Sequence, residues 1–164
     1  MFVSFFESAK YVGHLYPIAL LRIYMGYYYL NMALMRLGGE FLTQPRLAHI
    51  ITENLPQKDL PSWYANVLQN IVVPNWRFFA YFITYCEFII GVAFLIGFLV
   101  RPAALIGIFL MINFVYAGGG ATGPLSIDLQ QTFLALFIVM FWVGAGRCFG
   151  LDFYFYKRQR GLWW

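Results

Sequence analysis

Residues 78–100 read FFAYFITYCEFIIGVAFLIGFLV, an apolar run that contains one charged residue, Glu87. A helix needs roughly 20 mostly apolar residues to cross the hydrocarbon core of a bilayer, so this run is long enough to span a membrane. The whole chain has the same character, since 62% of its 164 residues are hydrophobic and 11% are charged. Typical soluble domains have about 25% charged residues. We therefore predict an integral membrane protein.

Three further segments are long and apolar enough to cross a bilayer, at residues 15–35, 102–121 and 129–146. Short links containing Pro102 and Pro124 join the last three spans. Short links force neighbouring helices to run antiparallel. The sequence therefore predicts an all-α fold, in which four transmembrane helices form one antiparallel bundle and a single domain.

The segments outside the spans are predicted to lie at the membrane surface. Residues 38–75 contain two runs whose apolar side chains recur at helical spacing, and these indicate short amphipathic helices across the outer face of the bundle. Residues 1–13 are expected to lie flat in the interface. Residues 147–164 form a basic and aromatic tail.

Lysine and arginine residues indicate the orientation of the spans. The side that holds both termini carries more of them than the opposite side, where they are spread over a longer loop. By the positive-inside rule, both termini are expected in the cytoplasm, in the cytoplasmic membrane of a prokaryote. The net charge of +4 is expected to meet anionic lipid headgroups rather than nucleic acid.

Polar residues within the spans are the candidates for function. Ionisable groups there cost about 2.5–3.5 kcal/mol each on insertion scales, and they usually face the bundle interior or a cavity. The estimated depths of Arg22 and Glu87 differ by about 8–10 Å at a rise of ~1.5 Å per residue, which a long arginine side chain can span. We therefore predict a buried Arg22–Glu87 pair. Further candidate ligand-binding residues are Tyr85, which is expected to line a pocket with Glu87, and a second polar group closer to the outer face: Asn31, Asn113, Asp128 and Gln131.

Two interpretations of these polar residues remain open. They can line a pocket for a lipophilic ligand such as a quinone, where Glu87 takes up or releases the proton that quinone chemistry requires. Alternatively, they hold the helices together, and the ion pair fixes their register.

Several other chemistries are not expected. His14 and His49 are predicted on opposite sides of the membrane, and no cluster of residues has metal-ligand spacing. Cys86 and Cys148 are predicted too far apart for a disulfide. The chain shows no cofactor-binding domain of its own, so any redox role needs a partner subunit or a quinone.

Three motifs resemble those of the DoxX family. Residues 87–104, EFIIGVAFLIGFLVRPAA, resemble its core signature, which is a carboxylate, two spaced glycines, and then an arginine with small residues. Residues 20–26, LLRIYMG, resemble its first span, and residues 144–152, GAGRCFGLD, resemble its usual close. Where relatives often show a His-Gly pair and then a lysine, this chain has Asn31 and Arg36.

The resemblance implies a four-helix membrane protein of the DoxX and DoxD group, one branch of which is associated with thiosulfate:quinone oxidoreductase. It singles out Arg22, Glu87 and Arg101. The expected function is that of a DoxX-like membrane subunit supporting quinone-linked electron transfer, at most one subunit of such an oxidoreductase. The alternatives are a non-catalytic assembly subunit of a larger respiratory or photosynthetic complex and a small solute or lipid transporter.

Overall fold

The computed structural model describes residues 16–55, 60–117, 126–147 and 150–152, and within them the fold is all-helical with no strand. The described residues form six α-helices: α2 (Tyr16–Gly38), α3 (Arg46–Asn54), α4 (Ser62–Val67), α5 (Trp76–Ile96), α6 (Val100–Ala117) and α7 (Ser126–Val143). A π-helix, η3 (Leu68–Val72), continues α4, and a 3-10 turn, η4 (Ala145–Arg147), follows α7. The predictions for residues 1–13, for the end of the third span, for Cys148 and for most of the tail lie outside the described residues.

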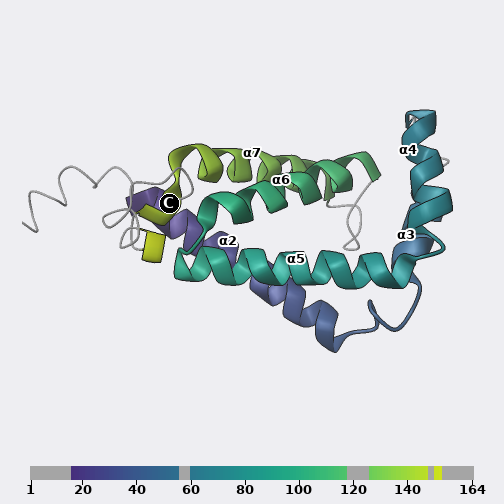
Figure 1. The fold of residues 1–164 in the computed structure, drawn as a ribbon, viewed down its shortest axis with the longest axis horizontal. Coiled ribbons are helices and arrows are strands. Elements are labelled where there is room, and N and C mark those ends of the chain that lie inside the picture. The colour runs from purple at the N-terminus through teal and green to yellow at the C-terminus, as the bar shows by residue number, and fades with distance from the viewer. Residues whose placement is uncertain (1–15, 56–59, 118–125, 148–149, 153–164) are drawn as a thin grey trace, which may run out of the picture.

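The long helices α2, α5, α6 and α7 run lengthwise through the molecule, and α3 and α4 lie across one end of them (Figure 1). Among the described residues, α5 is the helix long and apolar enough to cross a membrane. The segments 100–116 and 129–143 are shorter apolar helices.

Two glycines bring α2 and α5 into backbone contact. A Cβ atom added at Gly91 would lie 2.6 Å from the backbone N of Leu30, and one added at Gly26 would lie 2.7 Å from the backbone N of Leu95. Small residues at a helix interface allow such a close approach, as is common between membrane helices. These two contacts also show that α2 and α5 are antiparallel, and they set the register between the two helices.

At one end of the bundle, the segment after α7 holds the turn between α5 and α6. The backbone N–H groups of Leu99 and Val100 donate hydrogen bonds to the two Asp152 carboxylate oxygens, at 2.8 and 3.1 Å. The backbone N–H of Asp152 in turn donates to the carbonyl of Gly97 at 3.0 Å. Burial raises the pKa of the Asp152 carboxyl, and the two backbone donors oppose that rise. Asp152 therefore caps the N-terminus of α6 from a distant part of the chain.

We expect Asp152→Ala to destabilise the protein by about 1–2 kcal/mol, because it removes the acceptor of two backbone N–H groups at once. The measurement is the midpoint of thermal unfolding of detergent-solubilised protein, followed by circular dichroism. Leu151→Ala is the matched control, since that neighbouring side chain is 48% exposed and its loss should change little. Equal midpoints for the two variants would contradict the capping role.

Candidate functional site

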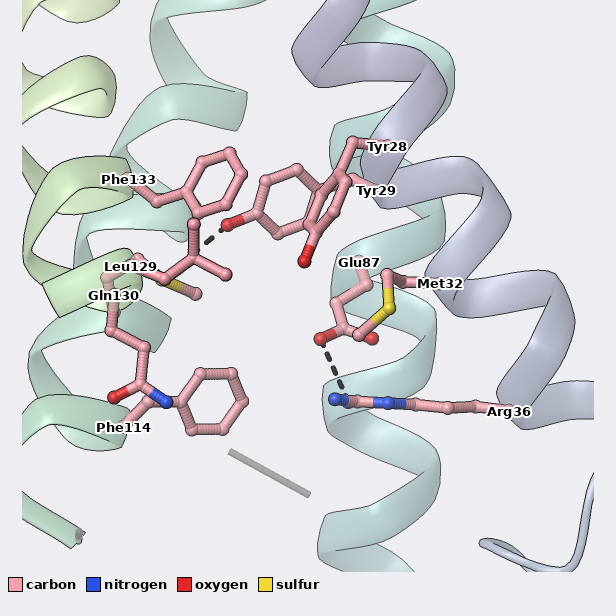
Figure 2. Close-up of a pocket in the computed structure, with 10 residues that line it drawn as sticks. Tyr28, Tyr29, Met32, Arg36, Glu87, Phe114, Leu129, Gln130 and Phe133 are labelled. Atoms are coloured by element: carbon pink, nitrogen blue, oxygen red, sulfur yellow. Dashed lines mark hydrogen bonds and ion pairs between the residues drawn. The ribbon is translucent and has the colours of Figure 1, made fainter. Parts of the chain in front are cut away.

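An ion pair is buried in the interior of the bundle. Arg36 lies in the last turn of α2 and Glu87 lies in α5, and Arg36 Nη1 is 2.8 Å from Glu87 Oε1 (Figure 2). The two side chains are 9% and 3% exposed. Burying two opposite charges has a high desolvation cost, which their attraction offsets only when geometry is good and further hydrogen bonds are made. The pair therefore needs a physical explanation.

The register of α2 against α5 explains why these two residues meet. Gly91 contacts Leu30, and Glu87 lies about one turn before Gly91 along α5. Because the helices are antiparallel, that step leads along α2 from Leu30 toward Arg36. The helix α2 continues to Gly38, so Arg36 is helical, and its side chain reaches back toward the N-terminus of α2, as helical side chains do.

Within the described structure, two atoms of this pair lack a hydrogen-bond partner. Glu87 Oε2 has none, and Arg36 Nη1, although close to Glu87 Oε1, lies outside hydrogen-bond geometry. Most buried polar atoms in folded proteins are bonded either to the protein or to an ordered water. The free carboxylate oxygen can therefore accept a hydrogen bond from a water molecule or a polar ligand group.

A small cavity of about 40 Å³ adjoins the Glu87 carboxylate (Figure 2). A buried water needs roughly 10–15 Å³ measured in this way, so the cavity has room for two or three. Helices α2, α5, α6 and α7 all contribute to its lining: Tyr28, Tyr29, Met32, Arg36, Glu87, Met111, Phe114, Leu129, Gln130 and Phe133. The cavity thus lies between the four helices, where Glu87, Arg36 and Gln130 are set among aromatic and apolar side chains.

Aromatic packing holds the wall of this cavity in place. The hydroxyl of Tyr29 donates to the Met111 sulfur at 3.5 Å, and the ring of Tyr29 lies against Phe133 and Phe137. The ring of Tyr28 stacks on Phe133, with centroids 4.8 Å apart. These contacts join α2 to α6 and α7 beside the charged pair.

The predicted Arg22–Glu87 pair is wrong, because Arg36 occupies that position. Arg22 is fully buried near the opposite end of α2, where its Nη1 donates to the carbonyl of Ala145 at 2.9 Å. The Arg22 guanidinium lies against Gly97, which caps the C-terminus of α5. Arg22 and Arg36 are almost four turns apart, or about 20 Å along α2. The prediction assumed that the N-terminus of α2 and the C-terminus of α5 lie at the same depth. In the structure, α2 extends beyond the C-terminal end of α5.

Other predicted ligand-binding residues do not line the cavity. Asn31, Tyr85 and Gln131 are exposed on the outside of the bundle, and the ring of Tyr85 stacks on Tyr81. Asn113 is half-buried, and its Oδ1 accepts a hydrogen bond from the Tyr64 hydroxyl at 3.3 Å. The side chain of Asp128 lies outside the described residues. Of the predicted set, the structure places Glu87 at the cavity.

Two residues of this site, Arg36 and Tyr29, are not among the site residues predicted from the sequence. Arg36 lies where DoxX relatives often have a lysine. Tyr29 and Arg36 are two turns apart and so share one face of α2. Gln130 is 7% exposed, whereas its neighbour Gln131 faces outward. Nothing in the local sequence distinguishes these two glutamines.

Metal binding finds no support in the part of the chain that the structure describes. No group of three or more His, Cys, Asp or Glu side chains could hold a metal ion there. Cys86 is a buried free thiol.

In the described residues, the fold and the site together define a protein of apolar helices, with a buried charged pair and a small cavity between them. The chain belongs to the DoxX family, because the DoxX family model matches residues 18–119, which is more than half of it. The matched range runs from α2 to α6, and the motif at residues 144–152 lies beyond it. Comparisons with curated proteins and with solved structures found no match.

Proposed function

We propose that the chain is a membrane subunit supporting quinone-linked electron transfer in a membrane oxidoreductase complex. In this proposal α2, α5, α6 and α7 cross the cytoplasmic membrane as a four-helix antiparallel bundle, and both termini are cytoplasmic. The observation that carries the proposal is the unpartnered Glu87 Oε2, which lies beside Arg36 in the interior of the bundle.

The surface of the long helices supports a membrane location. Large apolar side chains point outward along all of them, including Leu20 on α2, Phe78 on α5, Phe109 on α6 and Trp142 on α7, which are 60–82% exposed. The charged pair, in contrast, lies inside. Helices surrounded by lipid are expected to point apolar side chains outward and ionisable side chains inward.

The chemistry of the site fits a quinone. Reduction of a quinone to a quinol takes two electrons and two protons, so a site needs a proton donor and a group that hydrogen-bonds a carbonyl. Glu87 can deliver or accept a proton through water in the adjoining cavity, and the Arg36 guanidinium can donate to a carbonyl oxygen. In this proposal the electrons come from a partner subunit.

Quinone titration of the purified protein tests the proposal. We expect saturable quenching of tyrosine and tryptophan fluorescence by a short-chain ubiquinone or menaquinone. Glu87→Gln should weaken binding about tenfold, equivalent to ~1.4 kcal/mol, because it removes the charge that positions Arg36. Gln131→Ala, on the outside of α7, is the control and should bind as the wild type does. Absence of saturation, or equal affinity in Glu87→Gln, would argue against a quinone role.

A second candidate function is that of a non-catalytic assembly subunit. It is favoured by an apolar ridge on α4 and η3, where Trp63, Val67 and Ile71 are 67%, 38% and 50% exposed. A ridge of this kind fits a neighbouring subunit. Wild-type protein that binds no quinone, yet co-purifies with other membrane subunits in mild detergent, would favour this candidate over the first.

A further inference from the structure

A second, larger cavity lies on the other side of Arg36. It has a volume of about 250 Å³ and lies between α3, α4 and η3 on one side and parts of α5 and α6 on the other. Its lining is almost entirely aliphatic and aromatic, with Ile51, Leu68, Phe79 and Leu110 among the walls. We call this space the apolar chamber. Of the site residues predicted from the sequence, Asn113 lines this chamber.

Arg36 connects the apolar chamber to the charged pair. Arg36 and Phe114 line both the chamber and the small cavity next to Glu87. The Arg36 guanidinium also lies over the ring of Phe41, 4.8 Å from its centroid, and Phe41 is a chamber wall. Arg36 is 8% exposed, and its Nη1 lies 2.8 Å from Glu87 Oε1. A guanidinium has five N–H donors, so the wall of the chamber contains a buried N–H donor group.

The charge of the pair determines which acceptor suits this donor. Arg36 and Glu87 together are neutral when both are ionised, so an anionic ligand would be buried beside them without a counter-charge. Burial of an uncompensated charge is far more costly than burial of a hydrogen-bonded carbonyl. The chamber thus favours an uncharged molecule with a carbonyl oxygen over a fatty acid.

The volume of the chamber limits the size of the occupant. An apolar cavity of about 150 Å³ accepts benzene, so the chamber can hold a substituted ring or the first part of an aliphatic chain. A phospholipid with two chains is too large. At the rim, the Tyr64 hydroxyl bonds Asn113 and ties α4 to α6. Burial raises the pKa of Tyr64, so this hydroxyl remains a neutral donor.

We infer that the apolar chamber binds the body of a neutral, lipid-soluble carbonyl compound, with the Arg36 guanidinium donating a hydrogen bond to its carbonyl oxygen. This inference rests on the proposed function for its redox role, and it deepens that function by naming the place and the chemical class of the ligand. Glu87 then lies behind Arg36, next to the water-sized cavity, and not in the chamber itself.

A substitution that fills the chamber tests the inference. Ile83 is half-buried and lines the chamber, whereas Ile89 on the same helix is 51% exposed and does not. Radiolabelled decyl-ubiquinone and an unreactive long-chain methyl ketone are measured by equilibrium dialysis with the detergent-solubilised full chain. We expect Ile83→Trp to weaken binding of both probes at least tenfold, and Ile89→Trp to leave it within twofold. Decanoate should compete with neither probe.

A second chamber-filling variant and the comparison of the two probes distinguish the possible outcomes. Leu110→Trp fills the chamber from α6 and should act as Ile83→Trp does, which guards against one variant that fails to fold. Unchanged binding in both filled variants, or competition by decanoate as strong as that by the ketone, would overturn the inference. If Glu87→Gln weakens quinone binding while the filled variants do not, the inference that the chamber binds the ligand is wrong and the proposed function stands. If the ketone binds in the chamber but no quinone binds, the proposed function is wrong and the inference about the chamber stands.

Discussion

Arg36→Met alone is expected to destabilise the protein by about 3–5 kcal/mol, the cost of leaving one member of a buried ion pair without its partner. Methionine keeps much of the volume of the arginine stem, so the packing around Phe41 changes little. The Glu87 carboxylate, however, is 2% exposed and would lose its counter-charge. Protonation of Glu87 limits this cost but cannot remove it, because the neutral carboxyl group still needs hydrogen-bond partners.

The double variant Arg36→Met/Glu87→Leu should recover most of that stability. Replacing a whole buried pair by apolar residues of similar volume is often neutral or stabilising. The measurement is the unfolding free energy of the two single variants and the double variant in detergent, as a double-mutant cycle. Arg46→Met, at an exposed arginine of α3, is the control and should have little effect. A double variant as unstable as the sum of both single variants would contradict coupling between the two side chains.

Gly91→Ala is expected to destabilise the protein by about 3 kcal/mol, since overpacking a tight interface costs this much when the neighbour cannot move. The added Cβ would lie 2.6 Å from the N atom and 2.8 Å from the Cα atom of Leu30. Both are backbone atoms, so no side-chain rotation can relieve the contact, and α2 must move away from α5. We therefore also expect weaker quinone binding, because the same movement separates Arg36 from Glu87.

Gly38→Ala is the matched control for Gly91→Ala. An added Cβ at Gly38 has no atom within 4 Å, and alanine in a helix is favoured over glycine by roughly 0.5–1 kcal/mol. Gly38→Ala should therefore be neutral or slightly stabilising when both variants are followed by thermal unfolding. Equal midpoints for Gly91→Ala and Gly38→Ala would show that the contact between α2 and α5 adapts without cost.

The pair variants and the quinone titration together separate the two interpretations of the buried charges. If the pair is purely structural, Arg36→Met/Glu87→Leu should regain both its stability and its quinone binding. The proposed function predicts regained stability without regained quinone binding, because neither the donor to the carbonyl nor the proton carrier remains. The unpartnered Glu87 Oε2 favours the second outcome, since a pair that only fixes register has no need of a free oxygen.

Local sequence patterns are sufficient to predict the helical class of the fold and the family. The long apolar runs act locally, because a helix satisfies its own backbone hydrogen bonds, and composition alone reveals that these runs cannot form an ordinary soluble surface. The predicted membership of the DoxX family is confirmed by the match over residues 18–119. Glu87 was recognisable as a buried group, because it is the one charged residue in the run from 78 to 100.

The choice of the arginine that meets Glu87 is a property of the tertiary structure. That choice depends on the register between α2 and α5, which follows from the contacts of Gly26 and Gly91 and not from the distance of each residue to the end of its own span. The rotation of α7 likewise selected Gln130 over Gln131, because successive residues of a helix differ by about 100° in direction. Register and rotation are set by contacts between distant parts of the chain, and so no local stretch of sequence contains them.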